Sequence, residues 1–350
     1  MARRSNNVIS VLAFRLTVLG NVCLAASACG DQGSGSLYRA VTLERVRTVV
    51  RQDATPETSW LSRPSNLIHD STEDRLLTLD RDRQRVLEFT TSGEFVREYG
   101  RRGEGPGEMR NVKTAAAVAG RVVVLDQGNR KIVVFDRATA QLALEIPLRN
   151  QIPQSMAVIG DSLLAVVPGP DGALFELVSP EGDRRGQFGD GGFLAGGYPG
   201  HLVAHIGDER LVVVKPSLPE GRIYRLDGSP VDIFVFSELS HVLSEWRDQF
   251  AEKVRRRMGS LGTRDRGRIV AGRLYFTSIG PTGDGSFFLV APPENLDVEP
   301  WEVWILDHRG QIRRRYAFDQ PWIGRSTASF PRIYATGQGD QYGIFEYRIP

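Results

Sequence analysis

The chain has 350 residues, of which 41% are hydrophobic and 25% charged, values typical of a globular protein with room for one large domain or two ordinary ones. Its formal net charge is +2, but the first 28 residues hold Arg3, Arg4 and Arg15 and no acid, and the rest has 41 basic against 42 acidic residues, a net charge of −1. A chain without excess positive charge is not expected to bind nucleic acid.

Residues 1–28 have the layout of a secretory signal peptide. A basic start at 1–15 is followed by an apolar run at 16–26 that is too short to span a membrane, and then by small residues. Residues 26–29, Ala-Ser-Ala-Cys, resemble a bacterial lipobox, in which Cys29 becomes the lipidated first residue, although Ala26 stands where leucine is usual. The same residues fit cleavage without lipidation, so both outcomes stay open.

The segment after the cleavage site favours an anchored protein. Residues 29–36 are rich in glycine and serine and read as a flexible tether. We therefore expect a lipoprotein of the bacterial cell envelope, facing the periplasm or the cell surface, that meets the lipid bilayer through this anchor only. Cys23 leaves with the signal peptide, so the mature chain has no internal disulfide. Whether the inner or the outer membrane holds the anchor is left open.

The rest of the chain repeats a pattern of short apolar segments. Residues 75–100 and 121–147 each contain an apolar run ending in Leu-Asp, a polar turn, a second run ending in Phe or Phe-Asp, and another alternating segment. Their matching aspartates and phenylalanines are 46 residues apart. Weaker copies follow at 162–189, 210–236 and 273–318, and a partial copy at 332–349.

Each copy has the composition of β-strands joined by tight turns. The runs are rich in Val, Ile, Leu, Phe and Tyr, and Gly93, Gly228 and Gly310 occupy the same place in a turn that requires positive φ. Units of this length with four strands each predict propeller blades. We expect an all-β fold over residues 37–350: a six-bladed β-propeller of four-stranded antiparallel blades, its ring closed by an N-terminal strand at 39–50 that joins the last blade.

This pattern resembles the six-bladed propellers of the NHL-repeat and TolB-like kind. The resemblance rests on residues 86–109, with the phrase Gly-Pro-Gly-Glu, and on the Asp-x-Gly-Asn turn that begins at Asp126 and departs from the family pattern by an inserted Lys131. It implies that Gly100 to Glu108 join the outer strand of one blade to the inner strand of the next. A phosphate-binding loop would end in Gly-Lys-Ser/Thr or lie between a strand and a helix, and neither pattern is present.

A few polar residues are candidates for a site near the central channel. His201 and His205 are four residues apart at the start of a predicted inner strand, and His69 and Asp70 lie in the corresponding strand of the first unit. Histidines at the channel mouth are weak candidates for metal ligands. Without a third ligand at a recognisable spacing, we expect packing or solvated histidines and no cofactor, with a divalent metal in the channel as the alternative.

One segment interrupts the repeat. Residues 238–258 predict a helix, inserted between the fourth and fifth blades, with an apolar stripe that includes Trp246 and a basic end at Arg255 and Arg256. The helix is a lid or a partner site. Loops on a rigid scaffold carry function. The expected binding face therefore comprises His69, Asp70, Glu108, His201, His205, Trp246, Arg255 and Arg256.

These features favour a monomeric binding or scaffold module that contacts protein or peptide, with no catalysis expected. A fold of this kind hosts many functions, so two alternatives stay open. One is a metal-dependent hydrolase or lyase, lactonase-like, with its site at the channel mouth. The other is a binder of carbohydrate or cell wall, which would need exposed aromatic residues along a groove.

Overall fold

The computed structural model describes residues 40–51, 61, 64–148, 152–169, 171–194, 201–207, 209–215, 220–236, 276–291, 301–319, 323–338 and 342–350. All of them belong to the compact unit Tyr38–Pro350. The predicted signal peptide (1–28), Cys29, the tether (29–36) and the helix at 238–258 lie outside the described residues.

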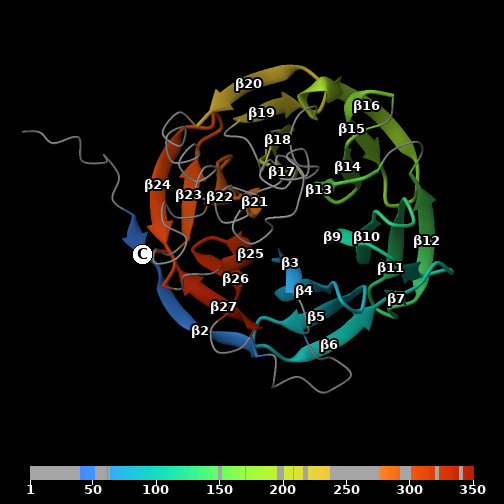
Figure 1. Cartoon of the computed structure of the whole chain (residues 1–350), viewed down its shortest axis with the longest axis horizontal. Helices are drawn as coiled ribbons and strands as arrows, with labels where there is room; N and C mark the ends of the chain where they lie inside the picture. Colours follow the sequence, from blue (N-terminus) through green and yellow to red (C-terminus); the bar gives the residue numbers. More distant parts are fainter. Residues whose placement is uncertain are drawn as a thin grey trace, which may run out of the picture. The chain divides into compact units, whose positions relative to one another are not determined.

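Within the described residues, the strands form six four-stranded antiparallel blades around a central axis, which confirms the predicted all-β six-bladed propeller (Figure 1). Blade 1 contains β3 (Pro64–Asp70), β4 (Arg75–Asp80), β5 (Arg85–Thr90) and β6 (Phe95–Tyr99); blade 2 contains β9 (Val112–Val118), β10 (Arg121–Asp126), β11 (Lys131–Asp136) and β12 (Leu142–Pro147); blade 3 contains β13 (Ser155–Ile159), β14 (Leu163–Val167), β15 (Ala173–Val178) and β16 (Arg184–Asp190).

The other three blades follow the same order from the axis outward. Blade 4 contains β17 (Leu202–His205), β18 (Arg210–Val214), β19 (Glu220–Arg225) and β20 (Pro230–Val235); blade 5 contains β21 (Ser278–Pro281), β22 (Phe287–Ala291), β23 (Glu302–Leu306) and β24 (Ile312–Ala317); blade 6 contains β25 (Ile323–Ser329), β26 (Arg332–Gln338), β27 (Tyr342–Arg348) and β2 (Glu44–Arg51). The described helical segment is the short 3₁₀ helix η3 (Gly191–Leu194). No helix in the described part of the chain is long and apolar enough to cross a membrane.

The two ends of the propeller meet in blade 6. The early strand β2 pairs antiparallel with β27, near the end of the chain, and forms the outer strand of that blade. Before it, β1 (Val41–Thr42) pairs parallel with β24 and adds a fifth strand to blade 5. Both pairings cover strand edges that would otherwise remain open.

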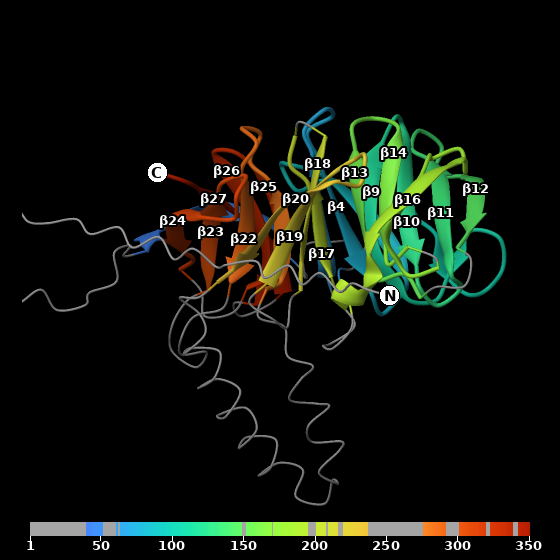
Figure 2. The same ribbon diagram turned by 90° about the horizontal axis from the view of Figure 1, so that it is seen from above.

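Each blade presents two ends, because its four strands reverse direction in turn (Figure 2). We call the end at which the inner strands begin the joint face, since the segments that link one blade to the next lie there. The opposite end, where each inner strand turns back into the second strand, is the turn face. This division follows from the strand order and fixes the position of every loop.

The core lies between the blades rather than inside any one of them. Along β10, Val122 and Val124 pack with side chains of blade 1, whereas Val123 and Leu125 pack with side chains of blade 3. All four side chains are fully buried. A middle strand with a neighbouring blade on each face is therefore a continuous apolar run instead of an alternating one.

The turns between third and fourth strands fasten neighbouring blades together. Gly93, Gly228 and Gly310 have φ values of 98°, 91° and 77°, as the sequence pattern predicts. A Cβ atom on Gly93 would lie 1.9 Å from the carbonyl oxygen of Val49 in the outer strand of blade 6. Glycine is thus required here both by the backbone conformation and by the approach of the adjacent blade.

We predict that Gly93→Ala destabilises the propeller far more than Gly172→Ala. Gly172 also has a positive φ of 84°, but a Cβ atom there would meet nothing within 4 Å, so its substitution should cost about 1 kcal/mol of backbone strain. Gly93→Ala should lose about 3 kcal/mol or more, because a backbone oxygen must move as well. Urea unfolding of both variants measures the difference, and equal losses would contradict the contact.

Candidate functional site

The joint between blades 1 and 2 is built from its own hydrogen bonds. It links β6 to β9 through the short parallel pair β7 (Arg101–Arg102) and β8 (Glu108–Met109). The amide of Gly105 donates to the Glu108 carboxylate, and the amide of Gly107 donates to the Glu145 carboxylate, both at 2.9 Å. A bound phosphate would require such amides. Carboxylates of the chain itself occupy them, which supports the prediction of a structural joint.

The turn that begins at Asp126 holds this joint in place. The fully buried Asp126 carboxylate accepts hydrogen bonds from the backbone amides of Arg110 and Asn111, and from the Asn129 side chain. Asn129 also donates to the Gly103 carbonyl at 3.1 Å. The Asp-x-Gly-Asn motif is therefore explained by its contacts with the neighbouring joint.

The structure places the predicted site residues at two opposite ends of the inner strands rather than on one face. Glu108 and His201 lie at the joint face, whereas His69, Asp70 and His205 lie at the turn face. His201 and His205 are four residues apart along one strand, which corresponds to about 13 Å. Trp246, Arg255 and Arg256 lie outside the described residues. In the described ranges, no three or more His, Cys, Asp or Glu side chains converge as a metal site would require.

His201 and His205 differ in their surroundings. His201 is 8% exposed, and its Nδ1 atom has no hydrogen-bond partner among the described residues. Burial, together with the nearby charge of Lys215, lowers the pKa of His201 to about 4. Burial also lowers the pKa of the half-buried His205. His201 is therefore a neutral packing residue near neutral pH.

Glu108 and His69 also serve local contacts. The Gly105 amide and the Arg101 guanidinium hold the pKa of Glu108 below its ordinary value. The ring of His69 packs against Tyr334 of blade 6, with ring centroids 5.2 Å apart, and its Nε2 lies 3.3 Å from Asp74. Glu108 therefore stabilises the joint between blades 1 and 2, and His69 stabilises the contact between blades 1 and 6.

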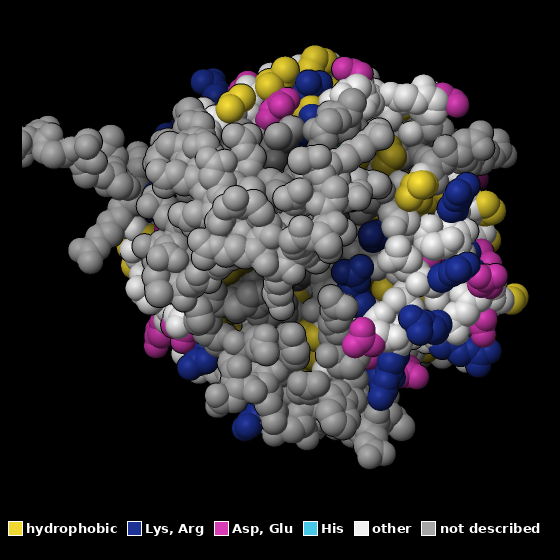
Figure 3. All heavy atoms as spheres, in the orientation of Figure 1, with side chains coloured by type: hydrophobic (Ala, Val, Ile, Leu, Met, Phe, Trp, Pro, Cys, Tyr) yellow, Lys and Arg dark blue, Asp and Glu magenta, His cyan; other side chains and the backbone are white. Residues whose placement is uncertain are grey.

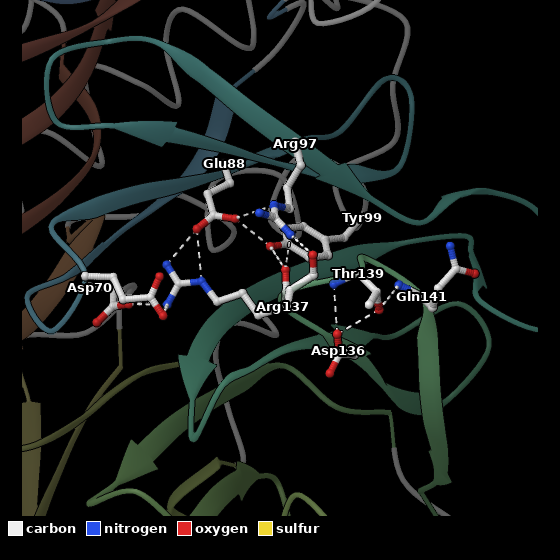
Figure 4. Close-up of polar contacts among 10 residues, drawn as sticks. Asp70, Glu88, Arg97, Tyr99, Asp136, Arg137, Thr139 and Gln141 are labelled. Atoms are coloured by element: carbon white, nitrogen blue, oxygen red, sulfur yellow. Dashed lines mark hydrogen bonds and ion pairs between the residues drawn. The ribbon is translucent and has the colours of Figure 1, made fainter.

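Asp70 belongs to a buried network of charges between blades 1 and 2 (Figure 4). Arg137 of blade 2 donates through Nε and Nη2 to the Glu88 carboxylate of blade 1, at 2.9 and 2.6 Å, and also pairs with Asp70. The Tyr99 hydroxyl donates to Glu88, and Arg97 donates to the backbone carbonyls of residues 137 and 138. Glu73, whose side chain is exposed, also pairs with Arg137 at 3.3 Å. The rest of the network is largely buried, so it acts as a clasp between blades.

The clasp keeps Asp70 ionised. Burial alone would raise its pKa, but hydrogen bonds from Thr72 and Arg137 and the charge of Arg137 outweigh burial, and the pKa of Asp70 lies below its ordinary value. An aspartate that is already paired in this way is poorly suited to accept a proton from a substrate.

A hollow of about 310 Å³ opens on the rim between blades 3 and 4. It lies between the outer strand of blade 3 and the last two strands of blade 4. The hollow is lined by Gly189, Asp190, Arg222, Tyr224, Gly228, Pro230, Asp232 and Ile233.

The inner wall of this hollow is rigidly held. The Arg222 guanidinium lies 4.3 Å from the ring centre of Phe193 in η3, and the Lys215 ammonium lies 4.4 Å from the same ring. Phe193 is 2% exposed. Tyr224 packs with its ring 5.8 Å from Phe175 and 6.3 Å from Phe188. Cation–π and aromatic contacts therefore fix the wall before any ligand arrives.

The outer wall of the hollow continues into an exposed apolar stripe on β20. Val231, Ile233 and Val235 are 37%, 57% and 63% exposed. Figure 3 shows hydrophobic side chains gathered over β20 at the upper rim of the molecule. Alternate residues of a strand point to the same side, so Ile233 and Val235 form a row, and Val231 precedes them at the register shift between β19 and β20. We call this row the β20 stripe.

Among blades 1 to 5, the position of Ile233 is apolar in blade 4 alone. In each of blades 1 to 5, the pairing of the third and fourth strands contains one register shift. Equivalent residues of the five outer strands can be identified by counting from this shift. At the position of Ile233 the other four blades carry polar residues, namely Glu98, Glu145, Gln187 and Arg315. The repeat pattern of the sequence did not predict this stripe. Its signal is the segment 230–236, in which both alternating sets are mostly apolar, unlike an ordinary outer strand.

Comparisons with known proteins agree on the fold. A family model described as a 6-bladed beta-propeller matches residues 54–162. No curated protein matches the sequence. The calcium-binding protein regucalcin from Agrobacterium tumefaciens is similar in structure, with a TM-score of 0.55, 12% identity, and coverage of 89% of this chain and 95% of that chain.

Two further similar structures carry different names. The virginiamycin B lyase from Staphylococcus aureus has a TM-score of 0.53 and 12% identity, and the match covers 85% of this chain and 83% of that chain. The WD40 repeats of RRP9 have a TM-score of 0.52 and 11% identity, and cover 86% of this chain and 83% of that chain. Likeness at this level shows the propeller fold alone.

We predict that Arg137→Ala lowers the free energy of unfolding by about 3–5 kcal/mol, because it removes the guanidinium that pairs with both Glu88 and Asp70 and leaves Glu88 with Arg97 at 3.6 Å. The matched control is Arg185→Ala, which removes a guanidinium from an exposed ion pair with Asp183 and should cost less than about 1 kcal/mol. Chemical denaturation compares the two. Similar small losses would show that the clasp does not hold blades 1 and 2 together.

We predict that His201 makes the propeller sensitive to mild acid. The pKa of His201 is about 4 in the folded chain and about 6.5 when unfolded. The unfolded chain therefore binds the proton more tightly, and stability falls by up to about 3 kcal/mol as the pH drops from 6.5 to 4. His201→Gln should flatten that part of the stability–pH curve. An unchanged curve would contradict the burial of a neutral imidazole.

Proposed function

We propose that the chain is a binding module of the bacterial cell envelope that holds a protein or peptide segment at the rim between blades 3 and 4. The observation that carries the proposal is the β20 stripe beside the hollow. Scattered apolar residues are ordinary on a surface, but a contiguous row next to a concave site is typical of an interaction surface.

The composition of this surface supports a peptide or protein ligand. The apolar row of Ile233 and Val235 is bordered by Asp190, Asp232 and Arg222. An apolar centre with a charged border is the usual anatomy of a protein interface. The described wall is rigid, which lowers the entropy cost of binding.

The other polar clusters favour binding over catalysis. Glu108, Asp70 and His69 hold joints and blade contacts, and His201 is buried. The envelope location is supported by the signal-peptide layout of residues 1–28 and by Cys29. Together these features support a scaffold whose recognition residues lie on the rim.

The proposal is tested by selecting a displayed library of random linear peptides on the purified full chain and on two variants. Ile233→Glu places a charge in the β20 stripe. Ile152→Glu is the matched control, because Ile152 is 54% exposed in another part of the surface, close to the 57% of Ile233. Peptides that the wild-type chain enriches should bind the Ile233→Glu variant at least about tenfold more weakly. They should bind the Ile152→Glu variant normally.

Two results would contradict the proposal. One is that no peptide is enriched by the wild-type chain. The other is that enriched peptides bind both variants equally well, which would place recognition elsewhere on the propeller. Thermal unfolding of the variants checks that each remains folded, since both substitutions lie at exposed positions and should change stability by less than about 0.5 kcal/mol.

A further inference from the structure

Among the strands that the structure describes, the outer edge of β20 has no partner and carries little charge. In the described part of the chain, β20 pairs with β19 on one side and with no strand on the other. Outer edges of propeller blades are commonly blunted by charge. Here β16 carries Arg184 and Arg185, and β6 carries Arg97 and Glu98, whereas Asp232 is the charged residue of β20.

The same molecule shows how such an edge accepts another strand. On blade 5, β1 lies parallel to β24, with Val41 opposite Tyr316 and Thr42 opposite Ala317. The Leu43 amide donates to the Ala317 carbonyl at 2.7 Å, and the Leu43 side chain is 2% exposed. A short parallel strand with one buried apolar anchor is therefore compatible with the edge of a blade in this ring.

β20 offers the corresponding groups. When β20 and β24 are aligned at their register shifts, Phe234 corresponds to Tyr316 and Val235 to Ala317. The acceptor that corresponds to the Ala317 carbonyl is thus the carbonyl of Val235. The Ile233 amide donates to the Asp232 carboxylate at 2.8 Å. In an antiparallel ladder, alternate residues direct their amide and carbonyl to the same side, so Ile233 and Val235 both direct theirs toward the open edge.

From this geometry we infer that β20 binds an extended peptide as a fifth, parallel strand of blade 4. The inference rests on the proposed function and specifies how the ligand is held. Backbone hydrogen bonds to Val235 supply the attachment, as they do for peptides that add to a sheet edge in other proteins. Every second side chain of the added strand lies on the side of the β20 stripe and packs against Ile233 and Val235.

The charges of the hollow define the ligand further. Asp190 and Asp232 line it together with Arg222, so the charged residues of the lining have a net charge of −1. The added strand runs parallel to β20, so its amino-terminal part lies near Asp232 and its carboxyl-terminal part near Val235. The ligand is therefore an extended segment with a Lys or Arg followed by β-branched residues at alternate positions.

The probe is the peptide acetyl-Lys-Thr-Val-Thr-Val-Thr-amide, labelled with a fluorophore and titrated with the purified full chain by polarisation. Single N-methyl groups placed along its backbone test the ladder. Methylation at one alternating set of amides should weaken binding at least about tenfold, and methylation at the other set should change it by less than about threefold. A probe that fails to bind, or that tolerates methylation equally at both sets, overturns the inference.

Two variants of the chain give the complementary test. Val235→Pro removes the amide that faces the open edge, whereas Val235→Thr keeps the amide and the branched shape. The first should abolish binding of the probe and the second should retain it. If Ile233→Glu weakens binding of the library peptides but N-methylation weakens binding of the probe equally at every position, the proposed function is supported and strand addition is contradicted. If Ile233→Glu changes the binding of neither the library peptides nor the probe, both the proposed function and strand addition are contradicted.

Discussion

The structure depends on one repeated contact, in which an outer strand of one blade is covered by the next. The apolar side chain of an outer strand packs beneath a turn of the following blade. Phe188 lies beneath Gly228, and Phe234 lies beneath Gly310, where a larger residue would not fit. Ring contacts such as Tyr99 with Phe135, at 5.9 Å, continue the same interface. Each blade buries the apolar face of the next, so the core consists of the interfaces between adjacent blades rather than the interior of any one blade.

This constraint also explains why the rim of blade 4 stands out. One face of each outer strand must be apolar to cover the next blade, and the other face is free to be polar. Glu98 and Glu145 follow that rule at the position of Ile233. In blade 4 both faces are apolar, although the stripe is largely exposed and contributes little to the core. Folding does not require this row, so binding is the physical reason we propose for it.

The sequence contains enough information for the blades but less for the site. Strand composition and the glycines at 93, 228 and 310 predict the fold, because both act locally. The clasp could not be predicted, because Arg137 meets Glu88 and Asp70 across 49 and 67 residues of chain, and many other charges have similar surroundings in sequence. His69 and His201 lie on opposite faces because His69 is near the end of β3 and His201 precedes β17, and residue spacing alone does not show where a strand begins and ends. Lipidation at Cys29 and the helix at 238–258 remain predictions.

We infer that the edge of β20 is open, whereas β1 covers that of β24 at Tyr316 and Ala317. Hydrogen exchange of the full chain, read by mass spectrometry of peptides from these two strands, tests it without a ligand. The outward-facing amide of Ala317 should exchange slowly, because β1 pairs with β24 at Tyr316 and Ala317. Residues 231–235 should include amides that exchange rapidly although Phe234 is buried. Equal protection of both strands would show that the β20 edge is closed, and would contradict the account.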